Sequence, residues 1–212
     1  LKGSGAGTGS ETPAEKTQRE QRAIMTVYLI RHAESVSNAG ERTASHGGAE
    51  LSSEGRRQAE ALTARIGFRP DLIVVSPFVR TRQTAEPLRQ KYPDVPVEEW
   101  PVQEFSFLDA DRCADTTQEE RRPLAEAYFA RNDPDYVDGK DAESFNQLLA
   151  RVDDMLTRLR ALPGENKTVV FTHGNFMRAA RLRLGGGPFS MTEFLRQPAA
   201  ENTEIVDITS YL

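Results

Sequence analysis

The chain has 212 residues, 38% of them hydrophobic and 28% charged, which is typical of a soluble globular protein with one well-formed core. The formal net charge of −5 argues against general binding to nucleic acid or to anionic membranes, and no apolar run is long enough to span a bilayer. The single cysteine excludes an internal disulfide and any cysteine-cluster metal site. The low cysteine content and the lack of a signal peptide in the sequence predict a cytoplasmic protein.

Residues 1–22 differ in composition from the rest of the chain. Residues 2–10 are mostly Gly, Ser, Ala and Thr, and residues 11–22 are polar and charged. Such a segment cannot bury enough apolar surface to offset its ordering entropy. No strand precedes the glycine-rich stretch 3–9 and no Lys-Ser/Thr follows it, so it is not a nucleotide-binding loop. We expect a flexible N-terminal segment over residues 1–22 and a single domain over residues 23–212.

From residue 26 onward, short apolar runs alternate with amphipathic stretches. The apolar runs predict strands at 27–30, 72–75, 97–102, 168–171 and 205–208. Helical periodicity and caps predict helices at 53–66, 80–92, 118–130, 145–159 and 174–184. This alternation predicts an α/β fold with a mostly parallel central sheet covered by helices on both faces. The polar stretch 105–139 is expected to form an irregular, partly helical cap insertion.

Chemically capable side chains follow three of the predicted strands. Arg31-His32 ends the first run, the stretch 76–80 follows the second and includes Arg80, and His173 follows the run 168–171. Ligands bind at the carboxyl ends of the strands in open parallel sheets. Two guanidiniums and two imidazoles are therefore expected to meet around one dianion.

These residue types suit phosphoryl transfer. An arginine fork matches phosphate oxygens in a bidentate way and neutralises charge that develops on them. A neutral imidazole can attack phosphorus if its other ring nitrogen donates to a fixed acceptor. The second imidazole can stay protonated and bind the transferring oxygens. A carboxylic acid must then protonate the leaving alkoxide.

At these residues the sequence resembles the histidine phosphatase superfamily, the phosphoglycerate mutase-like group. The resemblance covers about residues 26 to 208, and five stretches carry it: 29–38 (LIRHAESVSN), 51–59, 76–85 (SPFVRTRQTA), 102–105 (VQEF) and 172–179. There are two departures. Ala33 stands where glycine is commoner in the family, and the stretch 105–109 lacks the Gly-x-Trp-Glu-Gly pattern of the mutases and of many phosphatases.

The resemblance implies roles for individual residues. His32 would be the nucleophile that forms a phosphohistidine, and Glu104 would act first as general acid and then as base. The phosphoryl group would be bound by Arg31, Arg80 and His173, with further contacts from Asn38 and the backbone of Gly174. For this chain we expect activity that needs no metal and no cofactor. Without these motifs, His32 would more simply be a core histidine bonded to the backbone.

Several other residues compete for these roles. Glu98, Glu99 and Asp109, and less strongly Asp111, are alternatives to Glu104 as the acid. Arg82 competes with Arg80, but on a helix the two side chains point about 200° apart, so only one can face the pocket. His46 lies in a polar stretch and is expected at the surface, where a contact to the substrate is possible. The three histidines lack metal-ligand spacing, so no metal site is expected.

The sequence therefore predicts a phosphomonoester hydrolase of the histidine acid type, which acts on a small organic phosphate through phosphohistidine and without metal. Its expected partner is a small-molecule phosphomonoester, with no nucleic acid or membrane partner. Two alternatives stay open: a phosphoglycerate mutase-type phosphoryl transferase, and a phosphate-ester binding protein without catalysis.

Overall fold

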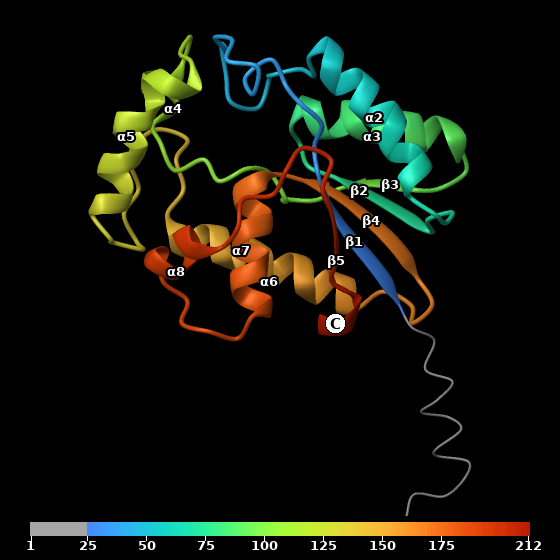
Figure 1. Cartoon of the computed structure of the whole chain (residues 1–212). Helices are drawn as coiled ribbons and strands as arrows, with labels where there is room; N and C mark the ends of the chain where they lie inside the picture. Colours follow the sequence, from blue (N-terminus) through green and yellow to red (C-terminus); the bar gives the residue numbers. More distant parts are fainter. Residues whose placement is uncertain (1–24) are drawn as a thin grey trace, which may run out of the picture.

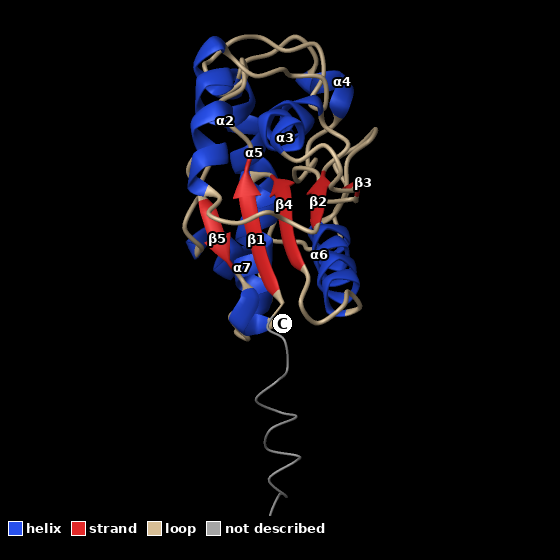
Figure 2. Cartoon of the chain, turned by 90° about the vertical axis from the view of Figure 1, so that its right-hand side faces the viewer, coloured by secondary structure: helices blue, strands red, loops and turns tan. Residues whose placement is uncertain are grey.

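One five-stranded sheet lies at the centre of residues 25–212, the part of the chain that the computed structural model describes. Its strands are β1 (Thr26–Arg31), β2 (Leu72–Val75), β3 (Val97–Glu99), β4 (Lys167–Thr172) and β5 (Ile205–Asp207). They lie in the order β3-β2-β4-β1-β5, and only β5 runs antiparallel to its neighbour (Figure 2). The predicted, mostly parallel α/β sheet is thus confirmed. The segment 1–22 lies outside the described residues.

Burial on both faces explains why the central strands read as continuous apolar runs. All four residues of β2 are buried. In β1, Val27 and Leu29 face one core cluster while Ile30 faces the other. The edge strand β3 is shorter than predicted, because Pro101 has no N–H to continue the ladder and Val102 donates back to the carbonyl of Trp100.

Helices cover the two faces of the sheet (Figure 1). The first face is covered by α2 (Ser53–Arg65) and α3 (Val79–Lys91). The opposite face is covered by α6 (Phe145–Arg160) and α7 (Gly174–Leu184), and α8 (Met191–Arg196) packs beside α7 (Figure 1). The apolar stripe of α6, predicted from its spacing, is buried throughout. No helix within residues 25–212 is long and apolar enough to cross a membrane.

The start of α2 packs against the loop that follows β1. The hydroxyl of Ser52 caps the helix by accepting from the N–H of Gly55 at 2.9 Å. A Cβ atom at Gly55 would lie 1.8 Å from the carbonyl oxygen of Glu34, so only glycine fits there. The carboxylate of Glu34 accepts from the hydroxyl of Ser52, which gives it a structural role at the start of α2.

The cap insertion contains α4 (Ala110–Cys113) and α5 (Gln118–Ala130), joined by loops. The helix α5 matches the predicted range, whereas α4 and α8 were not predicted. Aromatic side chains anchor the cap to the core: the rings of Phe107 and Tyr128 lie 4.9 Å apart, and Phe105 packs on both of them. The chain ends in a short 3-10 helix (Thr209–Tyr211).

Candidate active site

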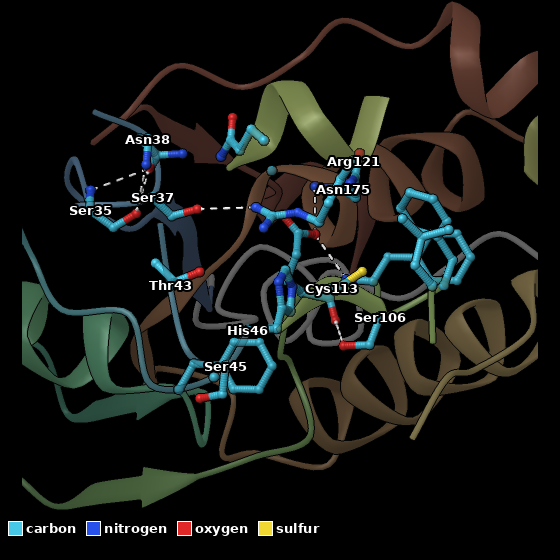
Figure 3. A pocket seen from close by; sticks show the side chains of 18 of the residues that line it. Ser35, Ser37, Asn38, Thr43, Ser45, His46, Ser106, Cys113, Arg121 and Asn175 are labelled. Atoms are coloured by element: carbon cyan, nitrogen blue, oxygen red, sulfur yellow. Dashed lines mark hydrogen bonds between the residues drawn. The ribbon is translucent and has the colours of Figure 1, made fainter. Parts of the chain in front are cut away.

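A cavity of about 750 Å³ opens where β1, β2 and β4 end, and the cap insertion forms its far wall (Figure 3). The structure brings six of the seven predicted site residues to its wall: Arg31, His32, Asn38, Arg80, Glu104 and Gly174. The seventh, His173, is fully buried behind the wall, and its ring centroid lies 5.0 Å from that of His32. The convergence expected from the ends of the strands is therefore present.

His32 is fixed in one orientation directly after β1. It is 2% exposed, and its Nδ1 lies 2.7 Å from the carbonyl oxygen of Ala33. A carbonyl only accepts, so Nδ1 carries the proton and Nε2 carries the lone pair. Burial first, and then the positive charge of Arg80, hold the pKa of His32 well below its ordinary value. The imidazole is therefore neutral at pH 7, with Nε2 as a nucleophile.

Ala33 fits where glycine is commoner in the family. Its methyl group is buried against Leu51 and Ala59, and its N–H donates to the hydroxyl of Thr84 at 3.0 Å. This departure leaves the carbonyl that orients His32 in place.

Two guanidiniums flank His32. Arg80 is 5% exposed; its Nε donates to Nε2 of His32 at 3.1 Å and its Nη1 donates to the carbonyl of His46 at 2.7 Å. Burial lowers the pKa of Arg80 to about 10, which leaves it charged at pH 7. Arg31 donates from Nη1 to the carbonyl of Ala200 at 2.6 Å, while its buried Nε has no partner among residues 25–212. The Nε–H of Arg31 has no acceptor and that of Arg80 has only the nitrogen lone pair of His32 within the described residues. Both donors are therefore available to bind an anion.

His173 belongs to a hydrogen-bond chain behind the cavity. Its Nε2 lies 2.7 Å from the hydroxyl of Ser76, which lies 2.9 Å from the hydroxyl of Thr81. Its Nδ1 is buried and has no partner in the described chain. Burial, followed by the charge of Arg80, lowers the pKa of His173 well below its ordinary value. Without a bound anion these surroundings therefore favour the neutral imidazole, whereas a bound dianion would favour the protonated form that is expected to hold the transferring oxygens.

Glu104 is the carboxylate placed to serve the cavity. Its Oε1 accepts from the N–H groups of Phe105 at 2.9 Å and Asn175 at 3.0 Å, the latter at the start of α7. No described residue bonds to Oε2, which makes that oxygen the one free to carry a proton.

The competing acids are engaged elsewhere. Glu98 accepts from the indole of Trp100 at 2.8 Å, and Glu99 pairs with Arg82, which is exposed as predicted. Asp109 caps α4, and Asp111, although it reaches the cavity wall, pairs with Lys140.

Asn38 and Gly174 lie at the cavity wall with different groups available. Oδ1 of Asn38 accepts from Ser35 N at 3.3 Å and from Ser35 Oγ at 3.1 Å, so the amide nitrogen is what remains for a ligand. Gly174 is the first residue of α7, where backbone N–H groups are not used within the helix. A Cβ atom at Gly174 would lie 3.4 Å from Nε of Arg31, which is an ordinary contact, so the space itself does not require glycine. Any contact of Gly174 with a ligand would come from its backbone.

Residues far along the chain position His32 and Arg31, and no local sequence pattern indicates this role. Asn202 donates from Nδ2 to the carbonyl of His32 at 2.9 Å, and Thr203 N donates to the carbonyl of Arg31 at 3.1 Å. With Ala200, these residues form a loop just before β5. Because β5 pairs with β1, this loop reaches the site through the topology of the sheet.

His46 is exposed, as expected, and it also lines the cavity. Its ring packs edge-on against Phe78 with the centroids 5.4 Å apart, and its carbonyl holds Arg80. Enclosure by the cavity walls, and then the charges of Arg80 and Arg121, lower the pKa of His46, although solvent reaches its side chain at the mouth.

The outer cavity combines apolar surface with three further arginines, Arg121, Arg122 and Arg178, of which Arg122 pairs with Glu119. Phe105 and Phe107 supply apolar wall, whereas Trp100 is buried in the core. Arg121 donates to Thr116 and Ser37, and Arg178 lies over the ring of Phe194. Neither arginine has a carboxylate partner within residues 25–212. Cys113 also lines the cavity, where burial raises the pKa of its thiol.

Metal ligands are not clustered in the described part of the chain. No group of three or more His, Cys, Asp or Glu side chains within residues 25–212 is arranged to hold a metal ion.

Known proteins resemble this chain in sequence and in fold. The family described as the histidine phosphatase superfamily (branch 1) matches residues 27–211. A metal-independent phosphoserine phosphatase from Arabidopsis thaliana is 26% identical over 166 residues, which are 76% of this chain and 69% of that protein. A probable phosphoglycerate mutase, GpmB, from Escherichia coli O1:K1 is 29% identical over 161 residues, which are 71% and 70% of the two chains.

Two solved structures show the same fold at lower identity. The mycobacterial glucosyl-3-phosphoglycerate phosphatase complexed with VO3 has a TM-score of 0.70 and 23% identity, covering 86% of this chain and 92% of the other. The phosphoserine phosphatase of Entamoeba histolytica in complex with 3-phosphoglyceric acid has a TM-score of 0.69 and 21% identity, covering 87% and 90%.

Proposed function

This chain belongs to the histidine phosphatase superfamily, and from that premise we propose that it hydrolyses small phosphomonoesters through a phosphohistidine on His32. One observation carries the proposal: His32 is buried and neutral, with Nδ1–H bonded to a carbonyl and Nε2 accepting from Arg80, in a cavity that Arg31 also lines. A neutral ring nitrogen in a cationic hollow is suited to attack on phosphorus.

Binding of the phosphoryl group would use the donors that converge on His32. Arg80 would move its Nε–H from the lone pair of His32 to a phosphoryl oxygen, and Arg31 would offer its free Nε–H. The dianion would raise the pKa of His173, whose Nδ1 could then donate to it while Nε2 donates to Ser76. Asn38 and the N–H of Gly174 would add neutral contacts.

The first half-reaction transfers the phosphoryl group to the protein. The Nε2 lone pair of His32 attacks phosphorus in line, an N–P bond forms, and the P–O bond to the alcohol breaks. Glu104 gives its proton to the leaving oxygen, so that a neutral alcohol departs. The positive charge of the phosphorylated imidazole is stabilised by the carbonyl of Ala33 at Nδ1–H.

The second half-reaction returns the protein to its starting state. Glu104, now a carboxylate, takes a proton from water while the water oxygen attacks phosphorus. The N–P bond breaks, inorganic phosphate leaves, and the lone pair returns to Nε2. No step draws on a metal ion, in keeping with a phosphatase of the histidine acid type.

The substrate that we propose is a small organic phosphate whose alcohol carries an anionic group such as a carboxylate. Arg121 and Arg178 support this, since both line the outer cavity and neither is paired with a described carboxylate. The named activities of the relatives, on phosphoserine and glucosyl-3-phosphoglycerate, involve such carboxylates. The free thiol of Cys113 fits a reducing, cytoplasmic setting.

A panel of phosphomonoesters tests the proposal, with wild-type protein and His32→Ala assayed side by side. We expect the wild type to release inorganic phosphate without added metal, with EDTA present and without a bisphosphate primer. His32→Ala should lose about 10³-fold or more. Phosphate moved between hydroxyls without release would indicate the mutase alternative. Ester binding without turnover, or loss of activity with EDTA, would contradict the proposal.

A further inference from the structure

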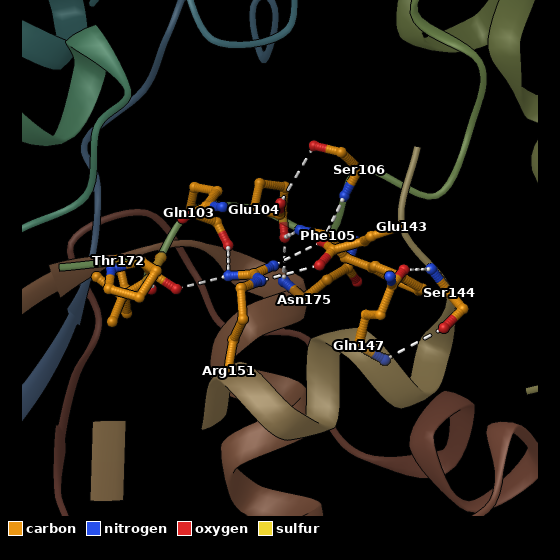
Figure 4. A network of polar contacts seen from close by, with 12 residues as sticks. Gln103, Glu104, Phe105, Ser106, Glu143, Ser144, Gln147, Arg151, Thr172 and Asn175 are labelled. Atoms are coloured by element: carbon orange, nitrogen blue, oxygen red, sulfur yellow. Dashed lines mark hydrogen bonds and ion pairs between the residues drawn. The ribbon is translucent and has the colours of Figure 1, made fainter. Parts of the chain in front are cut away.

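An ion pair between Arg151 and Glu143 lies beside the segment that carries Glu104 (Figure 4). Arg151 comes from the second turn of α6, and Glu143 directly precedes the capping residue Ser144. The pair is bidentate, with Nε to Oε2 at 2.9 Å and Nη2 to Oε1 at 2.6 Å. The side chains are only 15% and 16% exposed. Because burying both charges costs desolvation energy, the pair is poorly explained by stability alone.

Both members of the pair hold backbone groups that flank Glu104. Nη1 of Arg151 donates to the carbonyls of Pro101 at 2.8 Å and Gln103 at 3.0 Å. Oε1 of Glu143 accepts from the N–H of Ser106 at 3.1 Å, and the N–H of Glu143 donates to the carbonyl of Ser106 at 2.9 Å. Four hydrogen bonds therefore fix the chain on both sides of the carboxylate.

The same segment is joined to the end of β4. The hydroxyl of Thr172, the residue before His173, donates to the carbonyl of Val102 at 2.6 Å. The backbone from 101 to 106 is thus held on one side by the ion pair and on the other by the strand that leads into the site. Neither Arg151 nor Glu143 lines the cavity, so neither would touch a substrate bound there.

We infer that Arg151 and Glu143 are positioning residues that hold the Glu104 carboxyl at the leaving-group oxygen. The inference rests on the proposed function, in which Glu104 protonates the alcohol. A misplacement of about 1 Å at a catalytic group can cost about 10²-fold in rate. The loss should appear only when the leaving group needs a proton.

Two esters of similar shape separate this role from a general structural one. The leaving group of p-nitrophenyl phosphate is stable as an anion and needs little protonation, whereas p-nitrobenzyl phosphate would release an alkoxide and needs the acid. The quantity to compare is kcat/KM, because it reports the steps up to alcohol release and excludes hydrolysis of the phosphohistidine. The variant is Arg151→Lys, which keeps the charge but loses the planar fork. Arg158→Lys, at an exposed pair on the same helix, is the control.

For Arg151→Lys we expect kcat/KM to fall about 10²-fold with p-nitrobenzyl phosphate and less than about 3-fold with p-nitrophenyl phosphate. Arg158→Lys should change neither. In a Glu104→Gln background, Arg151→Lys should cost nothing more, within about 2-fold, because the group being positioned is already gone. If Arg151→Lys fails to fold, Glu143→Gln provides the same comparison, since it keeps the size of the side chain and loses half of the bidentate pair.

Equal losses with the two esters, or a further loss in the Glu104→Gln background, would overturn the inference. So would a wild-type-like Arg151→Lys, and in that case the proposed function would stand. If the wild type cleaves neither ester nor any other in the panel, the proposed function fails first and the inference fails with it.

Discussion

Acidification from about pH 7 to about pH 5.5 should destabilise the folded protein, and His32 and His173 should account for a defined part of that loss. Both imidazoles are buried, at 2% and 0% exposure, and both have a pKa well below the ordinary 6.5. In the unfolded chain they take up protons as the pH falls through 6.5, while in the folded protein they stay neutral. The unfolded state therefore binds more protons, and stability falls as the pH falls.

The size of the effect follows from linkage. Each imidazole that stays neutral in the folded state contributes about 1.25 kcal/mol of destabilisation over this interval, so the pair contributes about 2.5 kcal/mol. Urea unfolding at the two pH values measures the change in the free energy of unfolding. The control is the double variant His32→Gln/His173→Gln, which retains every other titrating group.

We expect the wild type to lose about 2.5 kcal/mol more than the double variant between the two pH values. Equal losses in the two proteins would refute the reasoning, because the buried imidazoles would then titrate as they do in the unfolded chain. Burial would in that case not be what keeps the nucleophile of the proposed mechanism neutral.

Further predictions concern the substrate, the fold and the phosphate site. Arg121→Gln should lower kcat/KM about tenfold for 3-phosphoglycerate and leave glycerol 3-phosphate, which lacks the carboxylate, unchanged; equal effects would show that Arg121 does not bind that group. Gly55→Ala should lower the free energy of unfolding, measured in urea, by about 2–3 kcal/mol. The control Gly67→Ala should change it little, because a Cβ atom there would meet open space. A Gly55→Ala variant as stable as the wild type would refute the close contact with Glu34. Vanadate should inhibit phosphate release at low concentration with EDTA present, since the arginine forks suit its pentavalent geometry; an unaffected enzyme would contradict this.

Elements with strong local patterns were predictable from the sequence. The apolar stripe that begins at Phe145 predicted the helix α6, and the capping residue Ser52 predicted the start of α2. The apolar run 72–75 predicted the strand β2. The short helix α4 was missed because four residues contain hardly one turn of periodicity. The strand predicted at 97–102 stops early because Pro101 cannot donate to the ladder.

The sequence predicted those site residues that directly follow the strands of the parallel sheet. The positions of Arg31, Arg80 and His173 followed from parallel topology. Contacts across more than 160 residues of sequence, such as Asn202 on the carbonyl of His32, have no local pattern that reveals them. The lowered pKa of His173 in the absence of a ligand could not be predicted for a related reason: it depends on complete burial beside Arg80, which only the assembled fold provides.

Chemical trapping of the phosphorylated protein tests the central claim most directly. Wild-type protein is mixed with a phosphomonoester that it hydrolyses in the panel assay, and the reaction is quenched in alkali, which preserves phosphohistidine. The peptide that contains residue 32 is then analysed by mass spectrometry. We predict a phosphoryl group on His32 that is stable in base, is lost in acid and is absent from His32→Ala. Turnover without any phosphorylated residue, or with the phosphoryl group on another side chain, would contradict the account.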